Sequence, residues 1–283
     1  MKYLLLVALL LIPSAALVAQ EEAKADSVFG WNNEVVGSLN LAQTNFDNWS
    51  QGGENSLSWQ LNVNAKSVND RENYNWSNAG KISFGAVKVG DQETKKSVDE
   101  IKLESVLTYK ITHILNPYIA ATGETQFAKA YDYSTTPKLE ISKFMDPAFF
   151  TQSVGAGYAP SAVFKTRLGA ALKETITNVH LQYSDDPDTP EKTEKSRVEV
   201  GAESATDFSC KVAENMLLTS KLELFSNLES FQQIDVKWDT ILSAKVARYV
   251  DVNLNVKLFY DRDISRKRQL KQALALGLTY TIL

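Results

Sequence analysis

Two histidines and a single cysteine are the residues with most scope for nucleophilic or acid–base chemistry. A nucleophile needs a base within hydrogen-bond reach, and neither His113 nor His180 is near Cys210 in sequence. Distance along the chain does not exclude contact, but Cys210 follows a strand-like run and precedes a short polar turn. This position favours a turn or half-buried thiol over a catalytic one. With only one cysteine, no intramolecular disulfide can form.

An acidic run is the candidate metal site. Asp185, Asp186 and Asp188 lie in a stretch that also contains two prolines, and they could attract a divalent cation weakly. Oxygen ligands must be held in a defined coordination shell, and a solvated loop gives them no fixed frame. The chain also lacks a glycine loop of the phosphate-binding kind. The sequence therefore predicts no cofactor and no metal ion.

Many of the other charged residues alternate with apolar ones, and both signs occur. Mixed charges on one face of a sheet can pair across strands, which narrows a passage rather than selecting one ion sign. Phe225, Ile241 and Phe259 fall on the same face and argue against a wide water-filled channel. The residues predicted to line an interior are Lys102, Glu104, Arg167, Lys173, Arg197, Glu199, Glu203, Lys221, Glu223, Lys237, Asp239 and Lys257.

Such a face requires β-strands, and the stretch from Val250 to Tyr260 shows the pattern most clearly. Alternate residues are apolar and those between them are mostly polar, which is the period of a strand between two environments. Its length is about what a tilted strand needs to cross a membrane. The apolar face comprises Val250, Val252, Leu254, Val256, Leu258 and Tyr260, and the polar face comprises Asp251, Asn253, Asn255 and Lys257.

The same alternation recurs often enough to close a barrel. About twelve strands are predicted, an even number, as in single-chain bacterial barrels. Short turns alternate with longer polar loops, which places both termini on the short-turn side and the long loops outside the cell. The turns are expected near Asn69, His113, Ala159, Ala213 and Arg248, and the loops near Gly53, Gln92, Thr136, Asp186, Ser230 and Ser265.

The N-terminus predicts export. Lys2 supplies a positive charge, an apolar run follows from Tyr3 to Ile12, and small residues lead up to Ala19. We expect a signal peptide over residues 1–19, a short periplasmic leader over 20–30 and the barrel over 31–283. An N-terminal membrane anchor is the alternative. The net charge of -4 gives no reason to expect nucleic acid as a partner.

One short segment is more specific than a pattern. It reads Asn-Trp-Ser-x-Gly-Gly-x-Asn-Ser and resembles the signature of an uncharacterised family of Gram-negative outer-membrane proteins, domain-of-unknown-function family 3078. The resemblance implies a secreted outer-membrane barrel and no known activity. The glycine pair permits unusual backbone angles, so the loop is either a structural hairpin or a flap over the barrel mouth. The motif residues are Asn48, Trp49, Ser50, Gly52, Gly53, Asn55 and Ser56.

The sequence therefore predicts an all-β fold, a closed antiparallel up-and-down transmembrane barrel in the outer membrane. The expected function is that of a narrow solute conduit or a structural or surface-interaction barrel, and not that of an enzyme. A lipase-like outer-membrane enzyme is the first alternative, but neither His113 nor His180 begins the His-x-Ser motif that such a lipase uses. A soluble periplasmic β-sandwich that binds a ligand is the second. Expected partners are membrane lipid, the barrel assembly machinery and a small solute.

Overall fold

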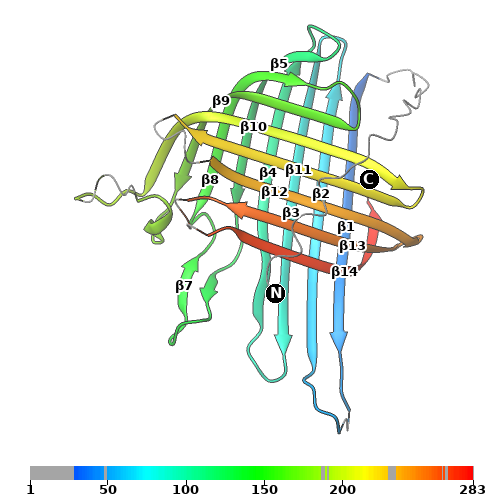
Figure 1. Ribbon diagram of the computed structural model, residues 1–283, viewed down its shortest axis with the longest axis vertical. Helices are drawn as coiled ribbons and strands as arrows, with labels where there is room; N and C mark the ends of the chain where they lie inside the picture. Colours follow the sequence, from blue (N-terminus) through cyan, green and yellow to red (C-terminus); the bar gives the residue numbers. More distant parts are fainter. Residues whose placement is uncertain are drawn as a thin grey trace, which may run out of the picture.

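Twelve long strands close into one antiparallel barrel, as the sequence predicts (Figure 1). This computed structural model describes residues 29–47, 50–185, 189, 191–228, 234–262, 264 and 267–282. The expected signal peptide lies outside the described residues, as does most of the expected leader. The soluble β-sandwich is wrong, because the strands form one closed sheet rather than two packed sheets.

The barrel strands are β1 (Gly30–Thr44), β2 (Ser56–Asp70), β3 (Tyr74–Val89), β4 (Lys95–Tyr109), β5 (Leu115–Thr125), β8 (Ala148–Tyr158), β9 (Phe164–Ile176), β10 (Ser196–Ala213), β11 (Met216–Asn227), β12 (Ile234–Ala247), β13 (Val250–Tyr260) and β14 (Gln269–Thr281). The long loop expected around Thr136 holds a small separate hairpin, β6 (Ala130–Asp132) and β7 (Leu139–Ser142). One 3-10 turn, Leu181–Tyr183, lies between β9 and β10.

The outer surface of the barrel is apolar. Leu103, Val154, Leu168 and Leu274 are all at least 60% exposed, although each lies within a strand. A water-soluble protein rarely exposes so many large apolar side chains, whereas a membrane barrel turns them toward lipid. Among the described residues, no helix combines the length and the apolar character needed to cross a bilayer. The closed sheet with its apolar exterior is the form that spans the outer membrane.

Aromatic rings gather at the end of the barrel where the short turns lie. The rings of Trp31 and Trp76 are 5.7 Å apart between centroids, and those of Tyr249 and Tyr280 are 6.1 Å apart. Amphipathic rings of this kind prefer the boundary between lipid and water. They therefore mark one edge of the membrane band.

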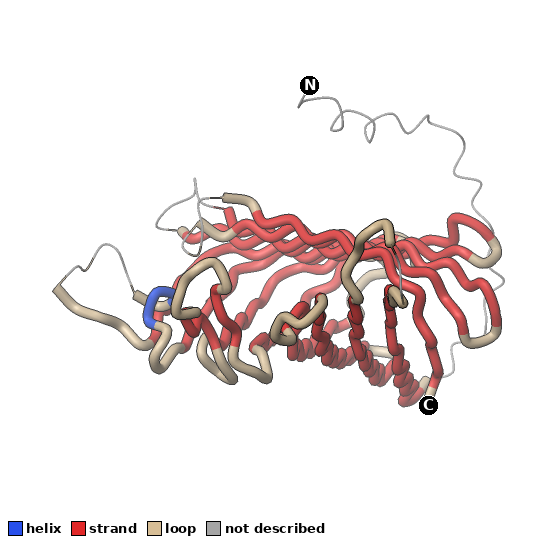
Figure 2. Tube along the Cα trace, turned by 90° about the horizontal axis from the view of Figure 1, so that it is seen from below, coloured by secondary structure: helices blue, strands red, loops and turns tan. Residues whose placement is uncertain are grey.

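The barrel is flattened, and its two broad walls cross. In Figure 1, β1 to β4 run along the long axis while β11 to β14 pass in front of them at a steep tilt. Figure 2 shows the two walls as layers that lie one above the other. Gly155 and Gly169 face one another where the sheet bends at β8 and β9. A Cβ atom on either residue would lie within 2.4 Å of a neighbouring backbone oxygen, so only glycine fits this bend.

Candidate functional site

The inner face of β4 is the centre of a charged network. Glu100, Lys102 and Glu104 occupy alternate positions of that strand, so all three side chains point to the interior. The wall opposite is formed by β11 to β13, and β5, β8, β9 and β10 separate β4 from β11 around the sheet. Contacts between β4 and that wall therefore cross the lumen and are not made between neighbouring strands.

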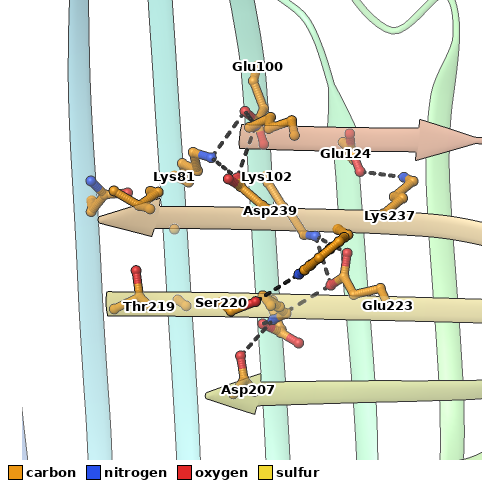
Figure 3. A pocket seen from close by; sticks show the side chains of 18 of the residues that line it. Lys81, Glu100, Lys102, Glu124, Asp207, Thr219, Ser220, Glu223, Lys237 and Asp239 are labelled. Carbon is orange, nitrogen blue, oxygen red and sulfur yellow. Dashed lines mark hydrogen bonds and ion pairs between the residues drawn. The ribbon is translucent and has the colours of Figure 1, made fainter. Parts of the chain in front are cut away.

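Ion pairs make these crossings directly (Figure 3). In each pair one group belongs to β4 or β5 and the other to β11, β12 or β13, and the side chains are between 13% and 34% exposed. The pairs are Lys102–Glu223 at 2.6 Å, Lys257–Glu100 at 2.8 Å, Lys237–Glu124 at 2.7 Å and Lys221–Glu104. The two walls are thus joined at mid-height by complementary charges rather than by apolar packing.

One part of the network is a square of alternating charge. Lys81 on β3 and Lys257 on β13 both approach the same two carboxylates. The Glu100 oxygen is 3.3 Å from the Lys81 amine and 2.8 Å from the Lys257 amine. The Asp239 oxygen is 3.2 Å from each amine. Each charge has two neighbours of opposite sign, so either one can be released while the other stays bound.

A second part of the network is held more rigidly. The Arg167 guanidinium lies 2.7 Å from a Glu104 oxygen and 3.3 Å from a Glu203 oxygen. The Ser153 hydroxyl donates to the same Glu203 oxygen at 2.6 Å, and the Tyr118 ring lies 5.8 Å from the guanidinium. A guanidinium can bind two carboxylates through its N–H groups and contact an aromatic ring at the same time. This corner fixes the position of Glu104 within the network.

A third cluster surrounds Lys173 nearer the loop end. Its ammonium lies 2.6 Å from Asp235, 3.2 Å from Asp261 and 3.6 Å from Glu199. Arg197 reaches the Glu199 carboxylate at 3.5 Å. Lys173, Asp235 and Asp261 line a small cavity of about 80 Å³, and Phe225 and Phe259 line it as well.

The structure places all twelve predicted lining residues on inner faces of β4 and β9 to β13. It also brings in Lys81, Glu100 and Asp261, which the sequence prediction left out. Lys81 and Glu100 each immediately precede an outward isoleucine, so strand alternation was a sufficient signal for both. Asp261 lies one residue beyond β13, where alternation no longer applies.

The network borders a large cavity within the barrel. The cavity measures about 980 Å³, and both walls line it. Ammonium and carboxylate groups are nearly equal in number around it, so it carries no strong net charge. The space is polar and large enough for several waters or a small solute. Its lining includes Lys66, Lys81, Glu100, Lys102, Glu104, Lys221, Glu223, Asp239, Lys257 and Lys271.

The structure explains two residues of the motif loop, Gly53 and Asn55. Asn48 and Trp49 lie outside the described residues. The Asn55 side-chain oxygen accepts a hydrogen bond from the Phe46 backbone N–H at 2.7 Å. Gly53 has a φ of +140°, and a Cβ atom there would come within 2.5 Å of the Phe46 ring. Ser50, Gly52 and Ser56 are described and close the hairpin between β1 and β2. Only glycine fits at Gly53, and Asn55 supports the turn.

The residues with nucleophilic or basic character are not brought together as a catalytic set. His113 lies in the turn between β4 and β5, and Cys210 lies half-buried on β10. His180 is 5% exposed and its Nδ1 lies 3.2 Å from a carboxylate oxygen of Asp146. Among the residues the structure describes, no cluster of three or more His, Cys, Asp or Glu side chains could hold a metal ion.

Two family models match different parts of the chain. Protein of unknown function (DUF3078) matches residues 41–131, and protein of unknown function, DUF481, matches residues 150–282. The first range includes the motif loop, so an uncharacterised family is supported there. No curated protein matches the chain.

Solved outer-membrane barrels are similar to the chain in strand arrangement. The COG4313 outer membrane channel from Pseudomonas putida F1 is 11% identical, with 89% of this chain and 95% of that chain covered and a TM-score of 0.41. The translocator domain of autotransporter NalP from Neisseria meningitidis is 9% identical, with 90% of each chain covered and a TM-score of 0.40. The KdgM porin is 9% identical, with coverage of 88% and 99% and a TM-score of 0.32. Scores this low carry no inference about function.

Proposed function

We propose that this protein is a narrow outer-membrane conduit for small solutes that performs no catalytic step. The observation that carries the proposal is the layer of ion pairs across the lumen beside a polar cavity of about 980 Å³. Groups with two alternative partners, such as Lys81, can exchange them while a solute passes. Balanced charge favours small polar solutes over ions of a single sign.

Assembly and the motif loop belong to the same proposal. A closed sheet satisfies its backbone only when every strand is in place, so insertion by the barrel assembly machinery fits this architecture. We assign the full Asn-Trp-Ser-x-Gly-Gly-x-Asn-Ser loop to holding the β1–β2 hairpin, as the contacts of Gly53 and Asn55 support.

Conductance across a planar bilayer tests the conduit. The double variant Lys102→Gln/Glu223→Gln removes both partners of one crossing, because removal of one alone would leave a buried uncompensated charge. We expect small single-channel currents from the native protein and an increase of about twofold or more in this variant, since an ion-pair constriction limits flow.

The matched control removes an ion pair outside the lumen. Lys138 and Glu93 are 2.6 Å apart and their side chains are 41% and 51% exposed. The variant Lys138→Gln/Glu93→Gln should conduct as the native protein does. If neither the native protein nor the Lys102/Glu223 variant conducts, the barrel is a structural one and the conduit is rejected.

A further inference from the structure

The seam that closes the barrel is short. β1 and β14 pair only from Val36 to Leu41 against Thr281 to Leu276, whereas β1 pairs with β2 along its whole length. The remaining part of β14, Gln269 to Ala275, pairs with β13 but not with β1. Figure 1 shows β1 continuing along the long axis while β14 turns away across the molecule. Within the described part of the chain, one edge of β14 is therefore unpaired over seven residues.

This free edge lies at membrane depth. Leu270 and Leu274 point outward from it and are 57% and 73% exposed, the pattern of lipid contact. Unpaired backbone groups are not tolerated against hydrocarbon unless they line a hydrated cavity. We therefore expect the gap between β1 and β14 to connect to water inside the barrel.

A cation stands on the inner side of the gap. Lys271 belongs to the free segment and donates to the Ser97 carbonyl oxygen of β4 at 3.1 Å, across the interior. No carboxylate among the described residues lies within ion-pair distance of it. Lys257 is its partner in register on β13, and both lysines line the large cavity. The cavity thus meets the gap at a positive group whose only hydrogen-bond partner, in the described part of the chain, is a neutral carbonyl.

We propose that the β1–β14 gap is a lateral portal through which an anionic amphiphile, a single acyl chain with a carboxylate head, passes between the bilayer and the cavity. The acyl chain runs along Leu270 and Leu274, and the carboxylate replaces the Ser97 carbonyl as acceptor for Lys271. A hydrogen bond from the Lys271 ammonium to a carboxylate is stronger than one to a neutral carbonyl. This difference favours transfer of the headgroup from the membrane interface to Lys271. The proposal deepens the conduit by naming a substrate class, and to that extent rests on it.

Photolabelling in lipid vesicles tests the portal. The probe is dodecanoic acid with a diazirine in its chain, and the readout is the yield of label on cavity-lining peptides. In a Cys210→Ser background, Gln43→Cys/Leu274→Cys is joined by a short bis-maleimide to hold the gap closed. The control Leu39→Cys/Leu278→Cys links positions already paired in the seam. We expect labelling to fall about tenfold with the gap held closed and to stay unchanged in the control.

A separate variant tests whether Lys271 binds the carboxylate headgroup. Lys271→Gln should reduce labelling by dodecanoic acid about tenfold and leave labelling by the matching diazirine alcohol unchanged, because only the acid needs the ammonium. Heat-modifiable gel mobility confirms that each variant is a folded barrel. Undiminished labelling with the gap closed would overturn the lateral path, and equal loss for acid and alcohol would overturn the role of Lys271. Bilayer conductance of the same cross-linked protein reports the axial conduit separately, so either proposal can fail alone.

Discussion

At the scale of single residues, Asp146 joins two loops at the loop end of the barrel. Asp146 is 1% exposed, and its carboxylate accepts hydrogen bonds from the backbone N–H groups of Asn178, Val179 and His180 at 3.0, 2.9 and 3.2 Å. Burial alone would raise the pKa of Asp146, but these three donors hold it below its ordinary value. A depressed pKa means that the stabilisation is complete above the ordinary carboxyl range and is lost as the pH falls through the folded-state pKa.

The variant Asp146→Asn tests this contact. An amide cannot accept hydrogen bonds from all three N–H groups as a carboxylate does. We therefore expect the free energy of local opening of the β9–β10 loop to fall by roughly 1–3 kcal/mol. Limited proteolysis near residue 192 should be correspondingly faster at neutral pH. Asp132→Asn is the control, because among the described residues the Asp132 carboxylate accepts hydrogen bonds only from Ser134 of its own turn. Equal cleavage rates in the two variants would show that Asp146 does not tie the loops together.

Alternation predicted which charged residues face inward, but it could not predict their partners. The crossing pairs join residues far apart in the chain, such as Lys102 and Glu223. Their meeting depends on the shape of the closed, flattened sheet, which no local pattern encodes. His180 is similar: its loop position was predicted, but its burial against Asp146 depends on two separate loops.

At the scale of elements, β13 tests the assignment of inner and outer faces. Leu254 is 40% exposed and pairs with Leu242 and Leu274, all on the lipid side. Asn255 faces the interior and donates to an Asp239 oxygen at 2.6 Å. Leu254→Arg should reduce the free energy of unfolding by roughly 2–4 kcal/mol, because it places a charge near the bilayer midplane. Asn255→Arg should reduce it much less, since a carboxylate is adjacent.

Urea unfolding in lipid vesicles measures both variants. A greater loss of stability for Asn255→Arg would reverse the face assignment of β13, and by register that of its neighbours.

The strands themselves were predictable because each carries its own alternation. The short β1–β14 seam was not, because it joins the first strand to the last and its length depends on the stagger of the whole barrel. The β6–β7 hairpin is too short to show a period.

At the scale of the whole molecule, the barrel was predictable because its pattern repeats twelve times. An even number of strands brings the start of β1 and the end of β14 to the same rim, and the Ile282 N–H donates to the Val35 carbonyl oxygen there. All short turns share that rim, while the β6–β7 hairpin and the long loops lie at the other. The usual asymmetry of such barrels places the loops outside.

Trypsin added to intact cells tests this orientation. Lys138 lies in the β6–β7 hairpin with its side chain 41% exposed, and Arg248 lies in the exposed turn between β12 and β13. Exposed loop tips are the preferred sites of cleavage, so we expect intact cells to yield the fragment cut at Lys138. The fragment cut at Arg248 should appear only after the outer membrane is permeabilised. Lys138→Gln should remove the first fragment and Arg248→Gln the second, which assigns each band. Cleavage at Arg248 in intact cells, with Lys138 protected, would place the turns outside and require the portal to open toward the opposite leaflet.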